Sequence, residues 1–188
     1  MRIVAGQWRG RTLAAPSTDT TRPTSDKVRQ ALFNILAHQT WLPHWQLQGA
    51  VVADVCCGTG ALGLEALSRG ARRCFFIDHA PAALQTVRAN MAYLKAEGAS
   101  TVIAADVLAL DDAPTPCDLV LCDPPYAADP TPVIDRLLQK NWLAKGGVLV
   151  LETSRKAAVP DCLPHWPLAP LATRAWGQTA AAFWMHRG

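Results

Sequence analysis

From residue 50 onward, short apolar runs rich in β-branched and aromatic residues alternate with stretches whose apolar residues recur at helical spacing. The apolar runs are 50–55, 73–77, 101–105, 118–122 and 147–152. The helical stretches between them are 60–70, 81–94 and 131–139. Parallel strands need crossover connections, and helices cover both faces of such a sheet. The alternation therefore predicts an α/β fold around a mostly parallel sheet.

Two further segments flank this alternation. Before it, 24–39 predicts an amphipathic helix capped by Thr24 or Ser25. Its apolar face is formed by Val28, Leu32, Ile35 and Leu36. After it, 160–170 is a proline-broken loop, and 171–186 predicts an antiparallel hairpin that closes an edge of the sheet.

Length and composition favour a single globular domain. The chain has 188 residues, of which 50% are hydrophobic and 18% are charged. Such a chain is long enough for one hydrophobic core and short for two. No apolar run reaches the ~20 residues that cross a bilayer, and residues 1–10 lack the apolar stretch of a signal peptide. We therefore expect a cytoplasmic monomer that makes no contact with a membrane.

The six cysteines form no Cys-x-x-Cys pair, which favours reduced thiols that pack as small apolar groups. The alternative is a metal site at Cys162 and His165, which are spaced as ligands. No second pair accompanies them to complete a set of four. We therefore expect no bound metal.

Positive charge is concentrated at the start of the chain. Residues 1–29 contain six basic and two acidic side chains, a net charge of +4, whereas the remainder has twelve basic and thirteen acidic side chains, a net charge of −1. Clustered arginines around a tryptophan, as in 7–11 (QWRGR), suit phosphate contacts and stacking on an unpaired base. The same composition also fits a solvated arm whose tryptophan packs on the domain.

A glycine-rich segment, 54–63 (DVCCGTGALG), lies between the first predicted strand and the first predicted helix. Gly58, Gly60 and Gly63 fit the pattern G-x-G-x-x-G, which lets a ligand approach the start of a helix. Asp78 ends the second strand, 20 positions after Gly58, where a carboxylate accepts hydrogen bonds from a ribose. Dinucleotide-dependent dehydrogenases and S-adenosylmethionine-dependent methyltransferases share both features. A third interpretation is that the glycines only form a tight turn and bind no ligand. Asp54 favours the methyltransferase, because its charge would repel a pyrophosphate and attract an ammonium or sulfonium.

The fourth strand ends in 123–126, Asp-Pro-Pro-Tyr, and ligands of open α/β sheets bind beyond the carboxyl ends of the strands. Two prolines hold Asp123 and the neighbouring carbonyls stiffly and offer no N–H group. Such acceptors suit the exocyclic amine of a nucleobase, whose lone pair must be aimed at a methyl donor. Tyr126 offers a ring on which the extruded base can stack. A proline turn that only closes a buried strand is the structural alternative.

The chain resembles the bacterial RsmD family over nearly its whole length. The segments that carry the resemblance are 2–13, 22–36, 54–71, 123–126 and, more loosely, 174–179. The resemblance implies a Rossmann-like class I methyltransferase with a seven-stranded sheet. It implies transfer of a methyl group from S-adenosylmethionine, which leaves as S-adenosylhomocysteine, to the N2 amine of guanine 966 in 16S ribosomal RNA, within the small subunit or its assembly intermediate.

The resemblance also implies roles for individual residues. The residues expected to bind the cofactor are Asp54, Gly58, Gly60, Asp78, His79 and Asp106, with Asp106 at the adenine amine. Those expected to hold the target guanine are Asp123, Pro124, Pro125 and Tyr126. Those expected to contact RNA are Trp8, Arg9, Arg11 and Arg22. We expect residues 1–40 to form a basic arm and helix that contact RNA, and 41–188 to form the methyltransferase domain.

This chain departs from the family pattern at three places. Cys56 and Cys57 replace the usual Phe-Ala, Tyr126 stands where phenylalanine is frequent, and Asp78 lacks the usual Glu-x-Asp pair. Three other functions stay open: methylation of another amine such as the N6 of adenine, a nicotinamide-dependent oxidation, and RNA binding without catalysis. The Asp-Pro-Pro-Tyr segment does not distinguish guanine from adenine.

Overall fold

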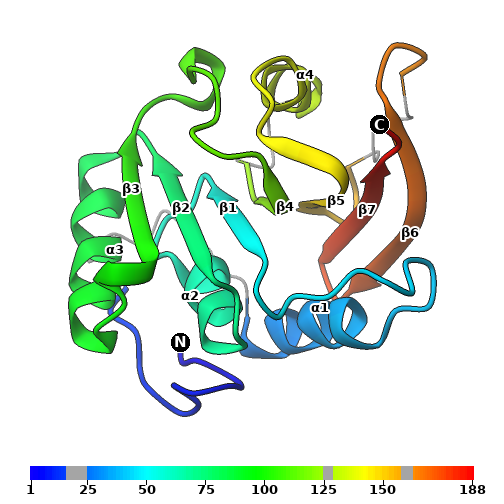
Figure 1. The fold of residues 1–188 in the computed structure, drawn as a ribbon. Coiled ribbons are helices and arrows are strands. Elements are labelled where there is room, and N and C mark those ends of the chain that lie inside the picture. The colour runs from blue at the N-terminus through cyan, green and yellow to red at the C-terminus, as the bar shows by residue number, and fades with distance from the viewer. Residues whose placement is uncertain (16–24, 125–128, 158–162) are drawn as a thin grey trace.

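The structure is a computed structural model, and it describes residues 1–15, 25–124, 129–157 and 163–188. Within these residues, seven strands form one sheet in the order β3-β2-β1-β4-β5-β7-β6 (Figure 1). The strands are β1 (Val51–Val55), β2 (Arg73–Asp78), β3 (Ser100–Ala104), β4 (Cys117–Cys122), β5 (Leu143–Ser154), β6 (Leu168–Trp176) and β7 (Thr179–His186). The helices are α1 (Asp26–His38), α2 (Ala61–Ser68), α3 (Pro81–Leu94) and α4 (Thr131–Gln139), with short 3-10 turns η1 (Glu97–Ala99) and η2 (Val107–Ala109).

The sheet has the predicted topology. Strands β1 to β5 pair in parallel, and β7 pairs antiparallel with both β5 and β6. The chain moves outward from β1 to β2 and β3 on one side, and then to β4 and β5 on the other. The strand order therefore reverses between β1 and β4, which is where an open α/β sheet forms its ligand crevice.

The sheet separates two hydrophobic cores because side chains alternate between its faces. Val52 packs in one core with residues of α1, α2 and α3. Val51 and Ala53 pack in the other with residues of α4. None of the helices in the described part combines the length and apolar character that a bilayer crossing requires.

Two boundaries differ from the predictions. Strand β5 spans twelve residues instead of the predicted 147–152, and it continues through Gly146 and Gly147. Strand β6 begins at Leu168, inside the segment predicted as a loop, and contains Pro170. This proline is tolerated because β6 is an edge strand and its pairing with β7 shifts register at Pro170.

Residues 1–13 form a hairpin that packs on the domain, and we call it the N-terminal hairpin. Arg2 and Thr12 form an antiparallel bridge, and Ile3 and Leu13 are buried in the core under α1, α2 and α3. Gly6 lies so close to the end of α2 that a Cβ atom there would stand 1.8 Å from the carbonyl oxygen of Ser68. The hairpin is therefore joined to the core and does not extend into solvent as a free arm.

Candidate active site

The carboxyl ends of four parallel strands meet at the point where the strand order reverses. The segments that follow these strands are held together by backbone hydrogen bonds across the strand ends. Cys57 N–H donates to Ile77 O at 3.0 Å, and Asp123 N–H donates to Val55 O at 3.2 Å. Ala105 N–H donates to Asp78 O at 3.1 Å. The loop after β1 is thus bonded to the end of β2, the residue after β4 is bonded to the end of β1, and the residue after β3 is bonded to the end of β2.

The loop 56–60 turns sharply from β1 into α2. Gly58 and Gly60 have φ angles of +53° and +75°, in the region that favours glycine. At Gly60 a Cβ would stand 2.5 Å from Val87 Cγ2, so packing against α3 also excludes a side chain. At Gly58 a Cβ would meet no atom of the described residues within 4 Å. Gly58 therefore faces open space, and Gly60 faces the core.

Asp78 holds the loop from the side of β2. One oxygen of its carboxylate accepts a hydrogen bond from Gly58 N–H, and the other accepts from Ala80 N–H, each at 2.9 Å. Asp78 is half-buried, and a carboxylate has capacity for further donors such as hydroxyl groups. The neighbouring His79 is exposed. Asp106, also exposed, caps η2 by accepting from Leu108 N–H at 2.9 Å.

Asp54 lies beneath the loop. Its side chain is 1% exposed, and Oδ2 accepts a hydrogen bond from Gly63 N–H in α2 at 2.8 Å. Burial raises the pKa of this carboxyl to about 8, and the charges of Asp78 and Glu152 act in the same direction against the Gly63 hydrogen bond. The arrangement shows Asp54 fixing the start of α2. Its contact with a cofactor ammonium stays a prediction.

The carboxylates together give the crevice a negative potential. Burial, followed by the charges of Asp78, Asp123, Asp54 and Asp106, raises the pKa of the Cys56 thiol to about 12. Cys56 follows β1 with a φ angle of +58° and lies at the mouth of the loop, near these carboxylates. Such a field attracts a cationic ligand and repels a pyrophosphate. It therefore fits a sulfonium-bearing cofactor better than a dinucleotide.

The segment after β4 is described only in part. Asp123 is half-buried and Pro124 is buried, while Pro125 and Tyr126 lie outside the described residues. The backbone bond from Asp123 to β1 places the first residue of the segment beside the glycine loop. The roles of Pro125 and Tyr126 stay predictions.

The residues predicted to contact RNA lie on or after the N-terminal hairpin. Arg9 and Arg11 are exposed, and the Arg11 guanidinium lies 5.6 Å from the centre of the Tyr93 ring. Trp8 is half-buried against the core, and its N–H donates to Ser68 Oγ at 3.0 Å. Arg22 lies outside the described residues. The hairpin turn thus sits at the end of α2 that is opposite the glycine loop, about 12 Å away for a helix of eight residues.

Two surface hollows of about 380 Å³ each border the N-terminal hairpin rather than the crevice. One is lined by Trp8 and by residues of α2 and α3. The other lies between the hairpin and α1, and its polar lining consists of Arg2, Arg9, Asp26, Lys27 and Gln30. The crevice is located by the strand ends and the cluster of carboxylates, whereas the second hollow is notable for its basic side chains.

The predicted metal alternative is only partly described, because Cys162 lies outside the described residues. His165 Nε2 lies 3.0 Å from Asp135 Oδ1. Across the described residues, no three or more His, Cys, Asp or Glu side chains are grouped in a way that could hold a metal ion. The absence of a metal stays a prediction.

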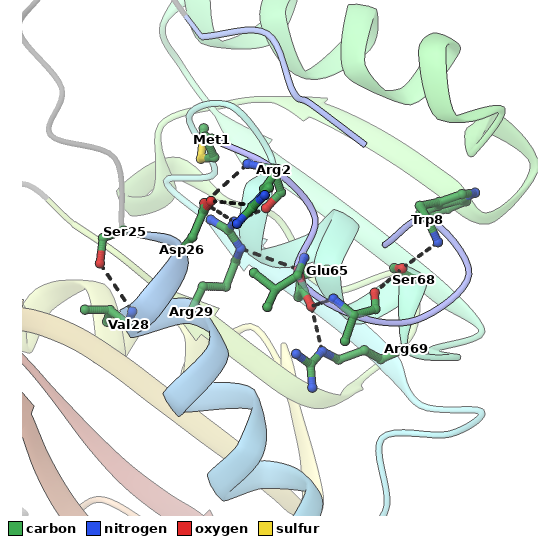
Figure 2. Close-up of polar contacts among 12 residues, drawn as sticks. Met1, Arg2, Trp8, Ser25, Asp26, Val28, Arg29, Glu65, Ser68 and Arg69 are labelled. Carbon is green, nitrogen blue, oxygen red and sulfur yellow. Dashed lines mark hydrogen bonds and ion pairs between the residues drawn. The ribbon is translucent and has the colours of Figure 1, made fainter. Parts of the chain in front are cut away.

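Sequence reasoning missed two buried polar residues that organise this region. Glu65 is fully buried in α2, and its carboxylate accepts from Val4 N–H at 2.7 Å and Ala5 N–H at 3.0 Å (Figure 2). Asn90 is buried in α3 and bonds to both the glycine loop and Ala14. A charged or amide side chain within an apolar helix was the signal in the sequence, since such groups are buried only with partners.

Comparison with known proteins agrees with the fold. The family model described as "Conserved hypothetical protein 95" matches residues 1–185. Ribosomal RNA small subunit methyltransferase D of Escherichia coli (strain K12) is 37% identical over 169 residues, which cover 89% of this chain and 82% of that protein. The Bacillus subtilis protein YlbH is 31% identical over the full length of both chains.

Solved structures extend the comparison. The Escherichia coli protein YhhF superposes with a TM-score of 0.82 at 35% identity, covering 99% of this chain and 97% of that one. The N-methyltransferase NodS of Bradyrhizobium japonicum WM9, in complex with S-adenosylhomocysteine, shares the fold with a TM-score of 0.67 at 18% identity, covering 92% and 94%. With a family model that matches nearly its whole length and relatives that align along it, the chain belongs to the RsmD family of methyltransferases and has their Rossmann-like class I fold.

Proposed function

We propose that this protein transfers a methyl group from S-adenosylmethionine to the exocyclic N2 amine of a guanine in 16S ribosomal RNA, and that the target is guanine 966. The observation that carries the proposal is the convergence of carboxylates on the glycine loop, with Asp123 and Pro124 at its edge. The name of the Escherichia coli relative supports ribosomal RNA of the small subunit as the substrate.

The crevice residues fit this cofactor. The open space at Gly58 lets a ligand approach the backbone of the loop, and the Asp78 carboxylate beside it is suited to ribose hydroxyls. Asp106 follows β3 at the same edge of the sheet, where it is suited to an adenine amine, and the exposed His79 follows Asp78 in the chain. The buried Asp54 lies beside the proposed methionine end and holds the start of α2 in place through the hydrogen bond from Gly63 N–H. When bound, S-adenosylmethionine supplies an electrophilic methyl group.

Asp123 and Pro124 prepare the amine for attack. The carboxylate and the neighbouring carbonyls accept the N–H bonds of the guanine N2 amine, which directs its lone pair toward the methyl carbon. An N–C bond forms as the S–C bond breaks, S-adenosylhomocysteine leaves, and the amine nitrogen, positively charged after the attack, loses one proton to solvent. We propose that Tyr126 stacks on the extruded base, as enzymes acting on nucleobases commonly require.

RNA contacts are proposed for the N-terminal hairpin and the basic hollow beside it. Arg9, Arg11 and Lys27 are exposed, and each lacks an ion-pair partner among the described residues. Asp26, which shares the hollow, is already paired with Arg29 at 2.8 Å. The remaining positive charge is available for phosphate groups. An RNA that reaches both the crevice and the hairpin turn must span the length of α2, about 12 Å for eight residues.

The test is transfer of labelled methyl groups from S-adenosylmethionine to small ribosomal subunits that lack the guanine mark. The modified base is then identified by nuclease digestion and mass spectrometry. N2-methylguanine at position 966 is the expected product. Methylation of an adenine N6, or of another guanine, would support a different amino-directed nucleic-acid methyltransferase. Transfer to no nucleic acid, despite binding of the cofactor, would overturn the proposed substrate.

A further inference from the structure

The amide of Asn90 connects three separate parts of the chain. Asn90 is 1% exposed and lies in α3 among apolar neighbours. Its Oδ1 accepts from Ala14 N–H at 2.8 Å, and its Nδ2 donates to Ala14 O at 3.2 Å and to Thr59 O at 2.9 Å. The donor at Ala14 settles the orientation of the amide, because an N–H group must face the oxygen and not the nitrogen. Both N–H bonds of the side chain are therefore used.

One of these partners belongs to the glycine loop. The carbonyl of Thr59 forms the peptide group with Gly60, whose N–H donates to Cys57 O at 2.7 Å. Asn90 and Cys57 thus hold opposite sides of a single peptide plane. Both flanking glycines have positive φ angles and little intrinsic preference for one conformation. The orientation of this plane consequently depends on the hydrogen bond from Asn90.

The other partner belongs to the N-terminal segment. Ala14 follows the N-terminal hairpin, in which Leu13 N–H donates to Met1 O at 3.0 Å. The hairpin is anchored on α2 through the hydrogen bonds of Val4 and Ala5 to the Glu65 carboxylate. Asn90 therefore connects an anchored hairpin to the Thr59 carbonyl of the loop, whose neighbouring N–H groups donate to Ile77 O, Asp78 and Cys57 O.

We propose that Asn90 is a positioning residue for the cofactor loop and that it makes the N-terminal segment part of the support of the cofactor site. The inference rests on the proposed function, because it takes the loop 56–60 as the place where S-adenosylmethionine binds. It adds that the surface expected to contact RNA and the loop expected to bind the cofactor are joined through the Asn90 amide, beside a weaker contact from Thr59 Oγ1 to Met1 Sδ at 3.9 Å.

The variant Asn90→Asp tests the connection with little change in volume. A carboxylate can still accept from Ala14 N–H, but it places an oxygen where Nδ2 donates to Thr59 O. The substitution loses both hydrogen bonds that Nδ2 donates, to Ala14 O and to Thr59 O, and only the second belongs to the loop. We expect the dissociation constant for S-adenosylhomocysteine, measured by calorimetry, to rise about tenfold from the loss of the loop bond. The KM for S-adenosylmethionine should rise by a similar factor, with kcat at saturating cofactor near the wild-type value.

The control separates positioning from stability. Leu137→Ala removes a buried side chain of α4, in the core on the other face of the sheet, and lowers stability without touching the loop. This variant should bind S-adenosylhomocysteine like the wild type at a temperature where both are folded. Hydrogen exchange of the amides in 56–60 should be faster in Asn90→Asp and unchanged in Leu137→Ala.

Two results would overturn the inference, and they can be told apart. If Asn90→Asp binds S-adenosylhomocysteine as tightly as the wild type while its melting temperature falls, Asn90 is merely structural and the proposed function is untouched. If the wild type does not bind S-adenosylhomocysteine at all, the proposed cofactor is wrong, and the inference falls with it.

Discussion

Nε of Arg29 lies 3.5 Å from Oε2 of Glu65, and both side chains are completely buried (Figure 2). The Glu65 carboxylate also accepts from Arg69 Nε at 2.7 Å and from two backbone N–H groups of the N-terminal hairpin. The Arg29 guanidinium in turn donates to the carbonyl of Arg2 and to Asp26. This network joins the hairpin, α1 and α2.

We predict that Glu65→Ala destabilises the protein by about 3–5 kcal/mol, because it removes one of the two carboxylates that pair with the buried Arg29 and the acceptor of two backbone N–H groups. Urea denaturation of the purified variants measures this loss. Asp112→Ala is the matched control, since Asp112 pairs with Lys140 at 3.4 Å but its side chain is 70% exposed. The control should lose no more than about 1 kcal/mol. Equal losses in the two variants would contradict the role assigned to Glu65.

Alanine substitutions in the glycine loop should separate packing from ligand binding. Gly60→Ala combines a positive φ angle with a contact of 2.5 Å to Val87, whereas Gly58→Ala is strained only in its backbone. Gly60→Ala should therefore lower the free energy of unfolding by about 1–3 kcal/mol more than Gly58→Ala does. Gly58→Ala should keep the fold and lose S-adenosylhomocysteine affinity, because its methyl group would occupy the open space of the crevice. Denaturation and calorimetry measure the two effects. Unchanged affinity in Gly58→Ala would show that the ligand does not approach this position.

The raised pKa of Asp54 predicts a dependence of stability on pH. A pKa of about 8 in the folded protein exceeds the value of about 3.9 expected for an unfolded chain. Between these values the folded protein retains a proton that the unfolded chain has lost, so this group's stabilising contribution falls as pH rises from about 4 to 8. The slope from this one group is at most about 1.4 kcal/mol per pH unit. Asp54→Asn should remove it.

Denaturation of the wild type and Asp54→Asn at several pH values from 5 to 8 isolates this contribution. Other titrating groups affect both proteins alike, so the difference between their free energies of unfolding is the informative quantity. That difference should change steadily in favour of Asp54→Asn as pH rises. Parallel curves would mean that Asp54 titrates outside this range.

The sheet could be predicted from the sequence because each strand is a local apolar run and each helix has local periodicity. The start of β6 could not be predicted, because Pro170 indicates a break in a strand unless that strand is known to lie at the edge of the sheet. Of the predicted apolar face of α1, Ile35 packs partly buried against the core, and the structure also buries Phe33 and Arg29, which were not predicted there. Arg29 was counted among the positive charges of the first 29 residues, but its partner Glu65 lies 36 positions away in sequence.

In the candidate site, too, some positions could be predicted from the sequence and others could not. The positions of Asp78 and Asp123 follow from one rule, that ligands bind at the carboxyl ends of parallel strands. The contacts of Asn90 follow from no such rule, because they depend on where the N-terminal segment packs. A buried amide in an apolar helix signals that partners exist, but only the tertiary structure identifies Ala14 and Thr59 as those partners.

Charge reversal tests the proposed RNA surface. Arg9→Glu and Arg11→Glu should each weaken binding to 16S ribosomal RNA. Each should also reduce the slope of the logarithm of the binding constant against the logarithm of the salt concentration by about 1, as expected for the loss of a phosphate contact. Affinity for S-adenosylhomocysteine should not change. Arg187→Glu is the control, because Arg187 is an exposed arginine after β7 with no side-chain partner among the described residues. An equal loss of RNA affinity in the control would show a general charge effect in place of a defined surface.

Asp123 and Asp78 should fail in opposite ways when each is replaced by alanine. Asp123→Ala removes an acceptor for the target amine, while the backbone bond from residue 123 to Val55 O can remain. It should therefore bind S-adenosylhomocysteine normally and lose methyl transfer about a hundredfold or more, because the amine is no longer aimed. Asp78→Ala removes the acceptor of Gly58 N–H and the proposed ribose contact, so it should lose cofactor affinity first.

Calorimetry with S-adenosylhomocysteine and single-turnover methyl transfer at saturating cofactor distinguish these two failures. The wild-type rate should return in Asp78→Ala at high S-adenosylmethionine and should not return in Asp123→Ala at any concentration. An active Asp123→Ala would mean that the carboxylate does not orient the amine. The remaining acceptors, which are the carbonyls fixed by the prolines after residue 123, would then have to hold the base without it.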